Sequence, residues 1–168
     1  MNLVAEGLRT VVELATPSLL GFGEPGVSTP PAPGKWSAKQ VLGHLVDSAT
    51  NNHARFVRAQ LAEDLVFPGY EQAAWVELQR YQESSWPDLV TLWRLYNLHL
   101  AQVIAAIPAE ARLRARARHN LHLLAWRPVP EEQPATLEYF LRDYVGHLNH
   151  HLRQIFRALG DVPPDPAS

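Results

Sequence analysis

Two histidines near the end of the chain have the spacing that allows them to share one metal ion. His147 and His151 are four residues apart in a segment with helical apolar periodicity. In an α-helix such a pair lies on one face, with Cβ atoms about 5–6 Å apart. Gln154 continues the same edge one turn later. Leu148, and not a glutamate, follows the first histidine, so the HExxH pattern of zinc proteases is excluded.

A third histidine belongs to an earlier segment, in which a line of polar residues runs beside the apolar side. At spacings of four, three and four, this line consists of His44, Ser48, Asn51 and Arg55. Asp47 lies next to it. A helix with such a line could border a buried polar pocket, and a solvated helix face has the same pattern. The spacing alone leaves both interpretations open.

Together the three histidines suit a metal site. Three neutral imidazoles supply three protein ligands and leave one coordination position open, as in catalytic divalent-metal sites. The ligands would be His44, His147 and His151. Side chains that could support them are Asp47, Asn51 and Tyr144. The alternative is that the HxxxH pair has no ligand role, because such pairs are common on amphipathic helices.

The other histidines and the tryptophans are expected to have no role in the site. The histidines without a partner at helical spacing are His53, His99, His119, His122 and His150. Helical phase places His150 roughly opposite the apolar stripe, so it should face away from the HxxxH pair. The tryptophans form no stacking series and are expected to anchor the core or the loops. They are Trp36, Trp75, Trp86, Trp93 and Trp126.

Four long segments with a period near 3.6 residues must position these side chains. Helices are expected over residues 2–16, 38–62, 86–107 and 136–159. Ser37 and Gln40 form a capping-box pattern before the second helix, and Thr136 can cap the last. Stretches rich in proline predict long connections at 17–36 and 109–135, and a short helix is expected within 70–82. The sequence therefore predicts an all-α four-helix bundle.

Length and composition favour one domain and exclude several kinds of site. The 168 residues are predicted to form a single domain, with a core over about 2–159 and a tail at 160–168. The absence of cysteine excludes a thiolate metal site, a cysteine nucleophile and disulfides, and fits a reducing, cytoplasmic location. No apolar run approaches the roughly 20 residues of a membrane span, so no membrane partner is expected.

The charge pattern gives no indication of a nucleic-acid partner. The formal net charge is -2. The dense basic run consists of Arg112, Arg114, Arg116 and Arg118. This run lacks the aromatic or groove-entering elements that nucleic-acid interfaces normally combine with basic residues. We expect a solvated loop or an anion contact there, and no nucleic-acid partner.

Two blocks of the sequence resemble the DinB-like superfamily. The first block comprises residues 34–37, 43–48 and 51–56, and the second is the segment 144–155. The resemblance extends over roughly residues 3–158. It implies an up-down-down-up four-helix bundle with a long crossover, frequent homodimers, and a Ni²⁺ or Zn²⁺ ion held by three histidines. The positions that match this triad are His44, His147 and His151.

The resemblance is compatible with several reactions, because similar proteins include thiol S-transferases, mycothiol-dependent isomerases and metal-dependent hydrolases. The S-transferases use a small thiol such as bacillithiol or mycothiol. Since this chain lacks cysteine, its thiol would arrive as a cosubstrate, and we expect a metal-dependent S-transferase acting on a small molecule. The alternatives are a hydrolase with Asp47 as base and a non-catalytic metal- or ligand-binding bundle. The candidate catalytic residues are Asp47, Asn51, Arg55 and Tyr144.

Overall fold

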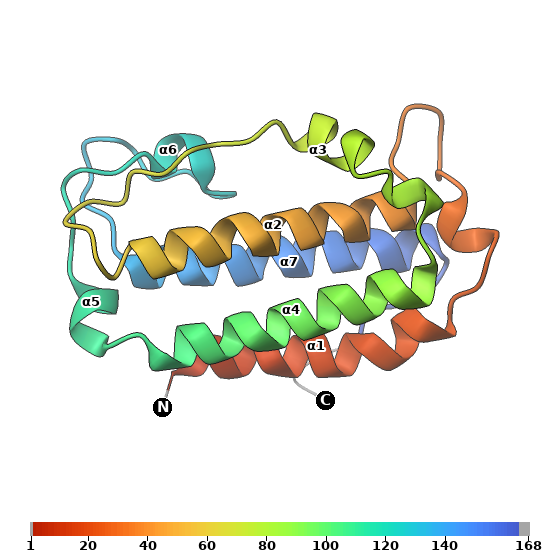
Figure 1. Ribbon diagram of the computed structural model, residues 1–168, viewed down its shortest axis with the longest axis horizontal. Helices are drawn as coiled ribbons and strands as arrows, with labels where there is room; N and C mark the ends of the chain where they lie inside the picture. Colours follow the sequence, from red (N-terminus) through yellow and green to blue (C-terminus); the bar gives the residue numbers. More distant parts are fainter. Residues whose placement is uncertain (1, 165–168) are drawn as a thin grey trace.

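The computed structural model describes residues 2–164, and these residues form an all-helical bundle (Figure 1). The four long helices are α1 (Leu3–Gly21), α2 (Ala38–Arg58), α4 (Trp86–Ala106) and α7 (Leu137–Ala158). Within the described range, β-pairing is confined to two isolated bridges and forms no sheet, so the predicted all-α class is confirmed. None of the described helices is long and apolar enough to cross a membrane. Of the predicted tail, residues 165–168 lie outside the described part of the chain.

The four long helices run in the order up, down, down, up (Figure 1). α1 and α7 point one way along the bundle, whereas α2 and α4 point the other way. Contacts join α1 to α4, α4 to α2, α2 to α7 and α7 to α1, so the helices enclose one core. Because α2 and α4 are parallel neighbours, the chain must return the whole length of the bundle between them. The crossover over residues 59–85 makes this return.

Two of the helix starts are fixed by the caps that the sequence predicts. The Ser37 hydroxyl accepts a hydrogen bond from the Gln40 N–H at 3.3 Å, and the Gln40 side chain accepts one from the Ser37 N–H at 3.0 Å. Thr136 accepts a hydrogen bond from the Tyr139 N–H at 3.1 Å. Each cap satisfies backbone donors that a helix leaves without partners in its first turn. These caps set where α2 and α7 begin, and hence the register of their histidines.

The first helix is longer than predicted. A connection was expected to begin at Pro17, but α1 continues through this proline to Gly21. Proline removes one intrahelical hydrogen bond, so packing must hold the last turn. Leu19 is fully buried there, and its carbonyl accepts a hydrogen bond from the Trp86 indole at 2.7 Å. The second helix differs in the other direction, because α2 ends at Arg58 and not near residue 62.

The long connections form a roof along one side of the α2–α7 pair (Figure 1). The crossover contains α3 (Gln72–Leu78) and a 3-10 turn, and the segment after α4 contains α5 (Ala109–Leu113) and α6 (Leu121–Leu124). Asn120 joins the two connections, because its side chain accepts a hydrogen bond from the Phe67 N–H and donates one to the Phe67 carbonyl. The roof is therefore an ordered part of the fold.

The arginine run lies in the segment after α4. Arg114 and Arg118 are exposed and three of the four arginines contact carboxylates, so the solvated loop and the anion contact that the sequence suggested each describe part of it. Ion pairs join Arg112 to Glu138, Arg114 to Glu63 and Arg118 to Asp64. Arg116 is buried and donates to the Ala59 carbonyl at 3.0 Å. The alternating spacing spreads these side chains toward different partners within the chain, and these contacts tie the two connections to each other and to the bundle.

Candidate metal centre

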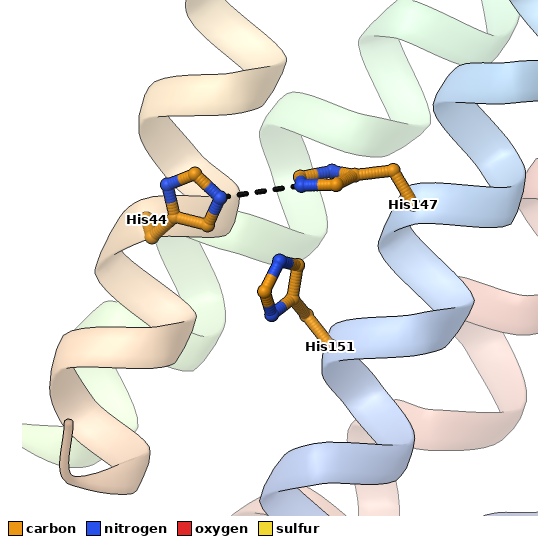
Figure 2. A group of neighbouring side chains, drawn as sticks. All are labelled: His44, His147 and His151. Atoms are coloured by element: carbon orange, nitrogen blue, oxygen red, sulfur yellow. Dashed lines mark hydrogen bonds between the residues drawn. The ribbon is translucent and has the colours of Figure 1, made fainter. Parts of the chain in front are cut away.

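Three imidazole rings from α2 and α7 converge where the two helices pass one another (Figure 2). One nitrogen from each of His44, His147 and His151 lies within 4.8 Å of the other two. His44 Nε2 and His147 Nε2 are 3.3 Å apart. The His151 ring centroid is 4.9 Å from that of His44 and 4.5 Å from that of His147. The structure thus brings together the three histidines that helical phase and the family resemblance both selected.

The separation of the His44 and His147 ring nitrogens fits two ligands of one tetrahedral ion. With metal–nitrogen bonds of about 2.0–2.1 Å, two ligands of one tetrahedral site lie roughly 3.3–3.4 Å apart. The distance of 3.3 Å between the Nε2 atoms of His44 and His147 falls in this range. Imidazole suits zinc and nickel, whereas calcium and magnesium prefer oxygen ligands. The donor set therefore matches a divalent transition metal.

Hydrogen bonds on the far side of two rings orient them toward the cluster. The Gln154 side-chain oxygen lies 2.8 Å from His151 Nδ1 and can only accept, so this nitrogen carries the proton and Nε2 keeps its lone pair. The Ser48 hydroxyl lies 3.5 Å from His147 Nδ1. His44 Nδ1 is buried without a partner among residues 2–164, and the Trp36 ring packs 5.4 Å from the His44 ring. His151 and His147 thus have a polar partner at Nδ1, whereas His44 has none among the described residues.

Burial keeps the three imidazoles in the form that binds metal. Desolvation, together with the smaller effect of nearby histidines, lowers the pKa of His44 to about 4 and that of His147 to about 3. Desolvation also lowers the pKa of His151, although the hydrogen bond to Gln154 opposes this shift. At neutral pH all three rings are consequently uncharged, so each has a nitrogen lone pair that can bind a cation.

Asp47 does not line the cleft described below. One of its carboxylate oxygens accepts hydrogen bonds from the Tyr81 hydroxyl, at 2.7 Å, and from the Gln79 side chain. Gly43 makes this contact feasible, because a Cβ at that position would lie 2.2 Å from the Tyr81 ring. Burial raises the pKa of Asp47. The Asn51 side chain donates to the backbone carbonyl of Asp47, and this second candidate does not line the cleft either.

A cleft of about 650 Å³ opens from the cluster along the α2–α7 pair, beneath the roof. His147 and His151 line one end of it. Of the four candidate catalytic residues, Arg55 and Tyr144 also line the cleft, whereas Asp47 and Asn51 do not. Tyr144 is buried and donates to the Asn97 side chain. The cleft gives a small molecule access to His147 and His151 of the cluster.

Asn52 is a residue of the cleft that the spacing argument missed. Its side chain accepts a hydrogen bond from Arg55 at 3.3 Å and donates to the Ser48 hydroxyl at 3.3 Å. Helical phase contains the signal, because at about 100° per residue Asn52 lies on the Ser48 side of His44 and Asn51 on the other side. Which side faces α7 depends on how the helices pack, so the sequence could not choose between the two asparagines.

Trp126 and His150 also border the cleft, although the spacing argument gave them no place there. Both oxygens of Asp143 accept hydrogen bonds, each of 2.8 Å, from the backbone N–H groups of Trp126 and Arg127. The indole then packs over Gly146, where a Cβ would lie 3.1 Å from the ring, and against the His150 ring at 5.3 Å. His150 is exposed and is not among the three clustered rings, yet it does not face the far side of the helix.

The other histidines lie away from the cluster. His53 Nδ1 is 3.0 Å from the Tyr96 hydroxyl, and the His53 ring packs 5.1 Å from that of His99, at the contact of α2 with α4. The sequence argument missed these partners because they belong to another helix. His119 is buried in the roof, where its Nε2 donates to the Gln133 carbonyl at 2.7 Å.

Comparison with known proteins gives a consistent family assignment. Residues 12–155 match the model of the DinB superfamily. The chain is 30% identical over 148 residues to "Putative metal-dependent hydrolase YfiT" of Bacillus subtilis, covering 88% of this chain and 74% of that protein. A Bacillus cereus protein of the same description, "Putative metal-dependent hydrolase", is 31% identical over 140 residues, which cover 83% of this chain and 74% of the relative.

The fold agrees with a solved structure. The structure of YfiT from Bacillus subtilis, described as having an unusual four-helix bundle topology, superimposes with a TM-score of 0.74. The match covers 94% of this chain and 86% of the other at 22% sequence identity, so it supports the fold alone. The family match over most of the chain, together with the fold, shows that this chain belongs to the DinB superfamily.

Proposed function

We propose that the chain binds a divalent ion, Zn²⁺ or Ni²⁺, through His44, His147 and His151, and transfers a small thiol to an electrophilic small molecule. The observation that carries the metal proposal is the convergence of three neutral imidazoles beside a cleft. An ion held by these three residues would keep a coordination position for a ligand other than protein.

The chemistry of the cleft supports a thiol as the incoming nucleophile. A divalent ion at the three histidines would lower the pKa of a coordinated thiol, so that the thiolate forms at neutral pH. The chain has no cysteine, so the thiol must come from outside. Among the described residues that line the cleft, the carboxylates are Glu71 and Asp143. Asp143 is occupied by two backbone N–H groups, and a reaction that needs no carboxylate base therefore fits this lining well.

Metal-dependent hydrolysis is the second candidate, and the printed names of the relatives favour it. Hydrolysis needs a group that takes a proton from water, within hydrogen-bond reach of it or through one further water. Asp47, the base expected from the sequence, is held by Tyr81 and does not line the cleft. Glu71 lines the cleft and is exposed, so it is the residue to which this candidate assigns the proton transfer.

The two candidates differ in their need for an added thiol. We would load the purified chain with Zn²⁺ or Ni²⁺ and measure turnover of an alkyl halide with bacillithiol, mycothiol or cysteine, and of ester and amide substrates without any thiol. Thiol-dependent turnover that is lost in His147→Ala supports the transferase. Ester or amide hydrolysis without thiol, lost in Glu71→Gln as well as in His147→Ala, would replace it by the hydrolase. Metal retention without turnover of any substrate would leave a metal-binding bundle.

The thiol cosubstrate also bears on where the protein acts. A free thiol cosubstrate requires a reducing compartment, and we therefore propose a cytoplasmic location. The homodimer implied by the family resemblance stays a prediction, which sedimentation velocity of the purified chain would test.

A further inference from the structure

Arg55 is a buried cation without a carboxylate partner. Arg55 is only 5% exposed. No ion pair within residues 2–164 includes it. Burying a charge without a partner of opposite sign destabilises a folded protein. Desolvation accordingly lowers the pKa of Arg55. The other buried arginine, Arg116, sits in the roof, whereas Arg55 lines the cleft and can receive a partner from outside.

Two hydrogen bonds hold the Arg55 guanidinium in place. Nη2 donates to the Pro68 carbonyl at 2.8 Å, and Nη1 donates to the Asn52 side chain at 3.3 Å. Asn52 is fixed in turn, because it donates to the Ser48 carbonyl at 2.9 Å. A guanidinium has five N–H donors, so these contacts orient it and leave donors over. Arg55 is thus a preorganised donor group at the cleft wall.

We propose that Arg55 binds a carboxylate of the substrate or cosubstrate, at a subsite separate from the three histidines. This inference rests on the proposed function in taking the cleft as the place where the reacting molecule binds. Ser48 contacts His147, and Arg55 follows it by seven residues on α2, which is about 10 Å along a helix axis. The ligand is therefore an extended molecule, with its reacting atom at the histidines and its carboxylate toward Arg55.

The charges of the cleft favour a carboxylate over a phosphate. Arg55 is the one lysine or arginine among the described residues that line the cleft, and Glu71 and Asp143 bring two carboxylates to the same lining. One cation in such surroundings suits a single negative charge and not a dianion. A guanidinium edge also matches the two coplanar oxygens of a carboxylate.

The test compares a carboxylate with its neutral amide on the metal-free full-length chain, so that the anion has no metal to bind. Hexanoate and hexanamide are titrated by calorimetry, and the Arg55 Nε–H resonance is followed by NMR. We expect hexanoate to bind about tenfold or more tightly than hexanamide and to shift this resonance, because a hydrogen bond to a charged group is worth at least a tenfold gain. Arg55→Gln should reduce the affinity for hexanoate to that for hexanamide, and Arg55→Lys should give an intermediate value.

Arg58→Gln is the matched control, since Arg58 is an exposed arginine on the same helix and should leave the preference unchanged. If the unmodified chain bound the two probes equally, or bound neither, that result alone would overturn the proposal. A preference that survives Arg55→Gln, or tighter binding of hexyl phosphate than of hexanoate, would also overturn it. His147→Ala should retain hexanoate binding, so a failure of thiol transfer and a failure of the carboxylate subsite are observed separately.

Discussion

The α1–α4 pair and the α2–α7 pair bury different kinds of side chain. The buried residues of α1 are apolar except Thr16, and those of α4 are apolar except Asn97. Thr16 bonds to the Val12 carbonyl of its own helix, and Asn97 donates to that of Trp93. By contrast, the buried polar and charged residues of α2 and α7 are Lys39, His44, Asp47, Ser48, Asn52, Arg55 and Asp143.

The buried polar and charged side chains, which could bind a ligand, are therefore concentrated in one half of the bundle. Burial of apolar surface stabilises the fold by about 25 cal/mol per Å², whereas burial of a polar group stabilises it little or not at all. Both pairs supply apolar burial, since α2 and α7 also bury side chains such as Phe56 and Leu148. The α2–α7 pair in addition holds histidines and an unpaired arginine that weaken the fold. The apolar burial shared by all four long helices offsets this cost. Substitutions in the α1–α4 pair should lower the free energy of unfolding and leave metal affinity unchanged. Substitutions of the clustered histidines in the α2–α7 pair should lower metal affinity and leave stability largely unchanged.

The largest change in stability should come from the apolar pair. Leu100→Ala removes a fully buried side chain of α4, and we expect the free energy of unfolding to fall by about 2–5 kcal/mol, because a cavity remains. The affinity for Zn²⁺, measured on the folded protein against a competing chelator, should not change. Denaturant titration gives the stability. A tenfold loss of metal affinity with little loss of stability would remove the distinction between the two pairs.

The largest change in metal binding should come from the polar pair. His147→Ala removes one of three proposed ligands, and we expect the affinity for Zn²⁺ to fall on the order of 100-fold or more, since even supporting residues are worth 10–100-fold. The metal-free variant should unfold at the same denaturant concentration as the unmodified chain or at a higher one. His150→Ala is the control, because this exposed neighbour is not among the clustered rings and should leave the affinity unchanged.

The stability of the metal-free chain should depend on pH through the polar pair. Folding lowers the pKa of His44 from 6.5 to about 4 and that of His147 from 6.5 to about 3. At a pH between the folded and the unfolded pKa of each histidine, the unfolded chain binds more protons than the folded chain. The free energy of unfolding therefore decreases as the pH falls below about 6.5. Above that pH this contribution is constant.

Urea titrations between pH 4 and pH 8 measure this dependence. The double variant His44→Gln, His147→Gln should flatten the curve below about pH 6.5, whereas Leu100→Ala should lower it by a similar amount at every pH. An unchanged slope in the double variant would mean that other groups cause the loss of stability in acid.

The smallest expected effect concerns the support of one ligand. Gln154→Leu removes the acceptor that lies 2.8 Å from His151 Nδ1. We expect metal affinity to fall by about 10–100-fold. Because Gln154 is exposed, stability should stay within about 0.5 kcal/mol of that of the unmodified chain. Gln154→Glu retains an acceptor and should retain most of the affinity. Full affinity in Gln154→Leu would show that packing alone orients His151.

The sequence by itself determined the features that depend on neighbours along the chain. The capping residues Ser37 and Thr136 set the starts of two helices, and both caps are present. The pairing of His147 with His151 follows from their spacing, because residues four apart share one face of any α-helix. The number and class of the long helices follow from apolar periodicity for the same reason.

The tertiary structure decided which faces meet, because this depends on contacts between residues far apart in the sequence. It placed Asn52 at the cleft and Asn51 away from it, although both lie close to the phase of His44. It allowed α1 to pass Pro17, since the last turn is held by Trp86 of another helix. It also folded the long connections into a roof that lines the cleft. No local pattern specifies such a contact, because its energy comes from side chains that meet only in the folded chain.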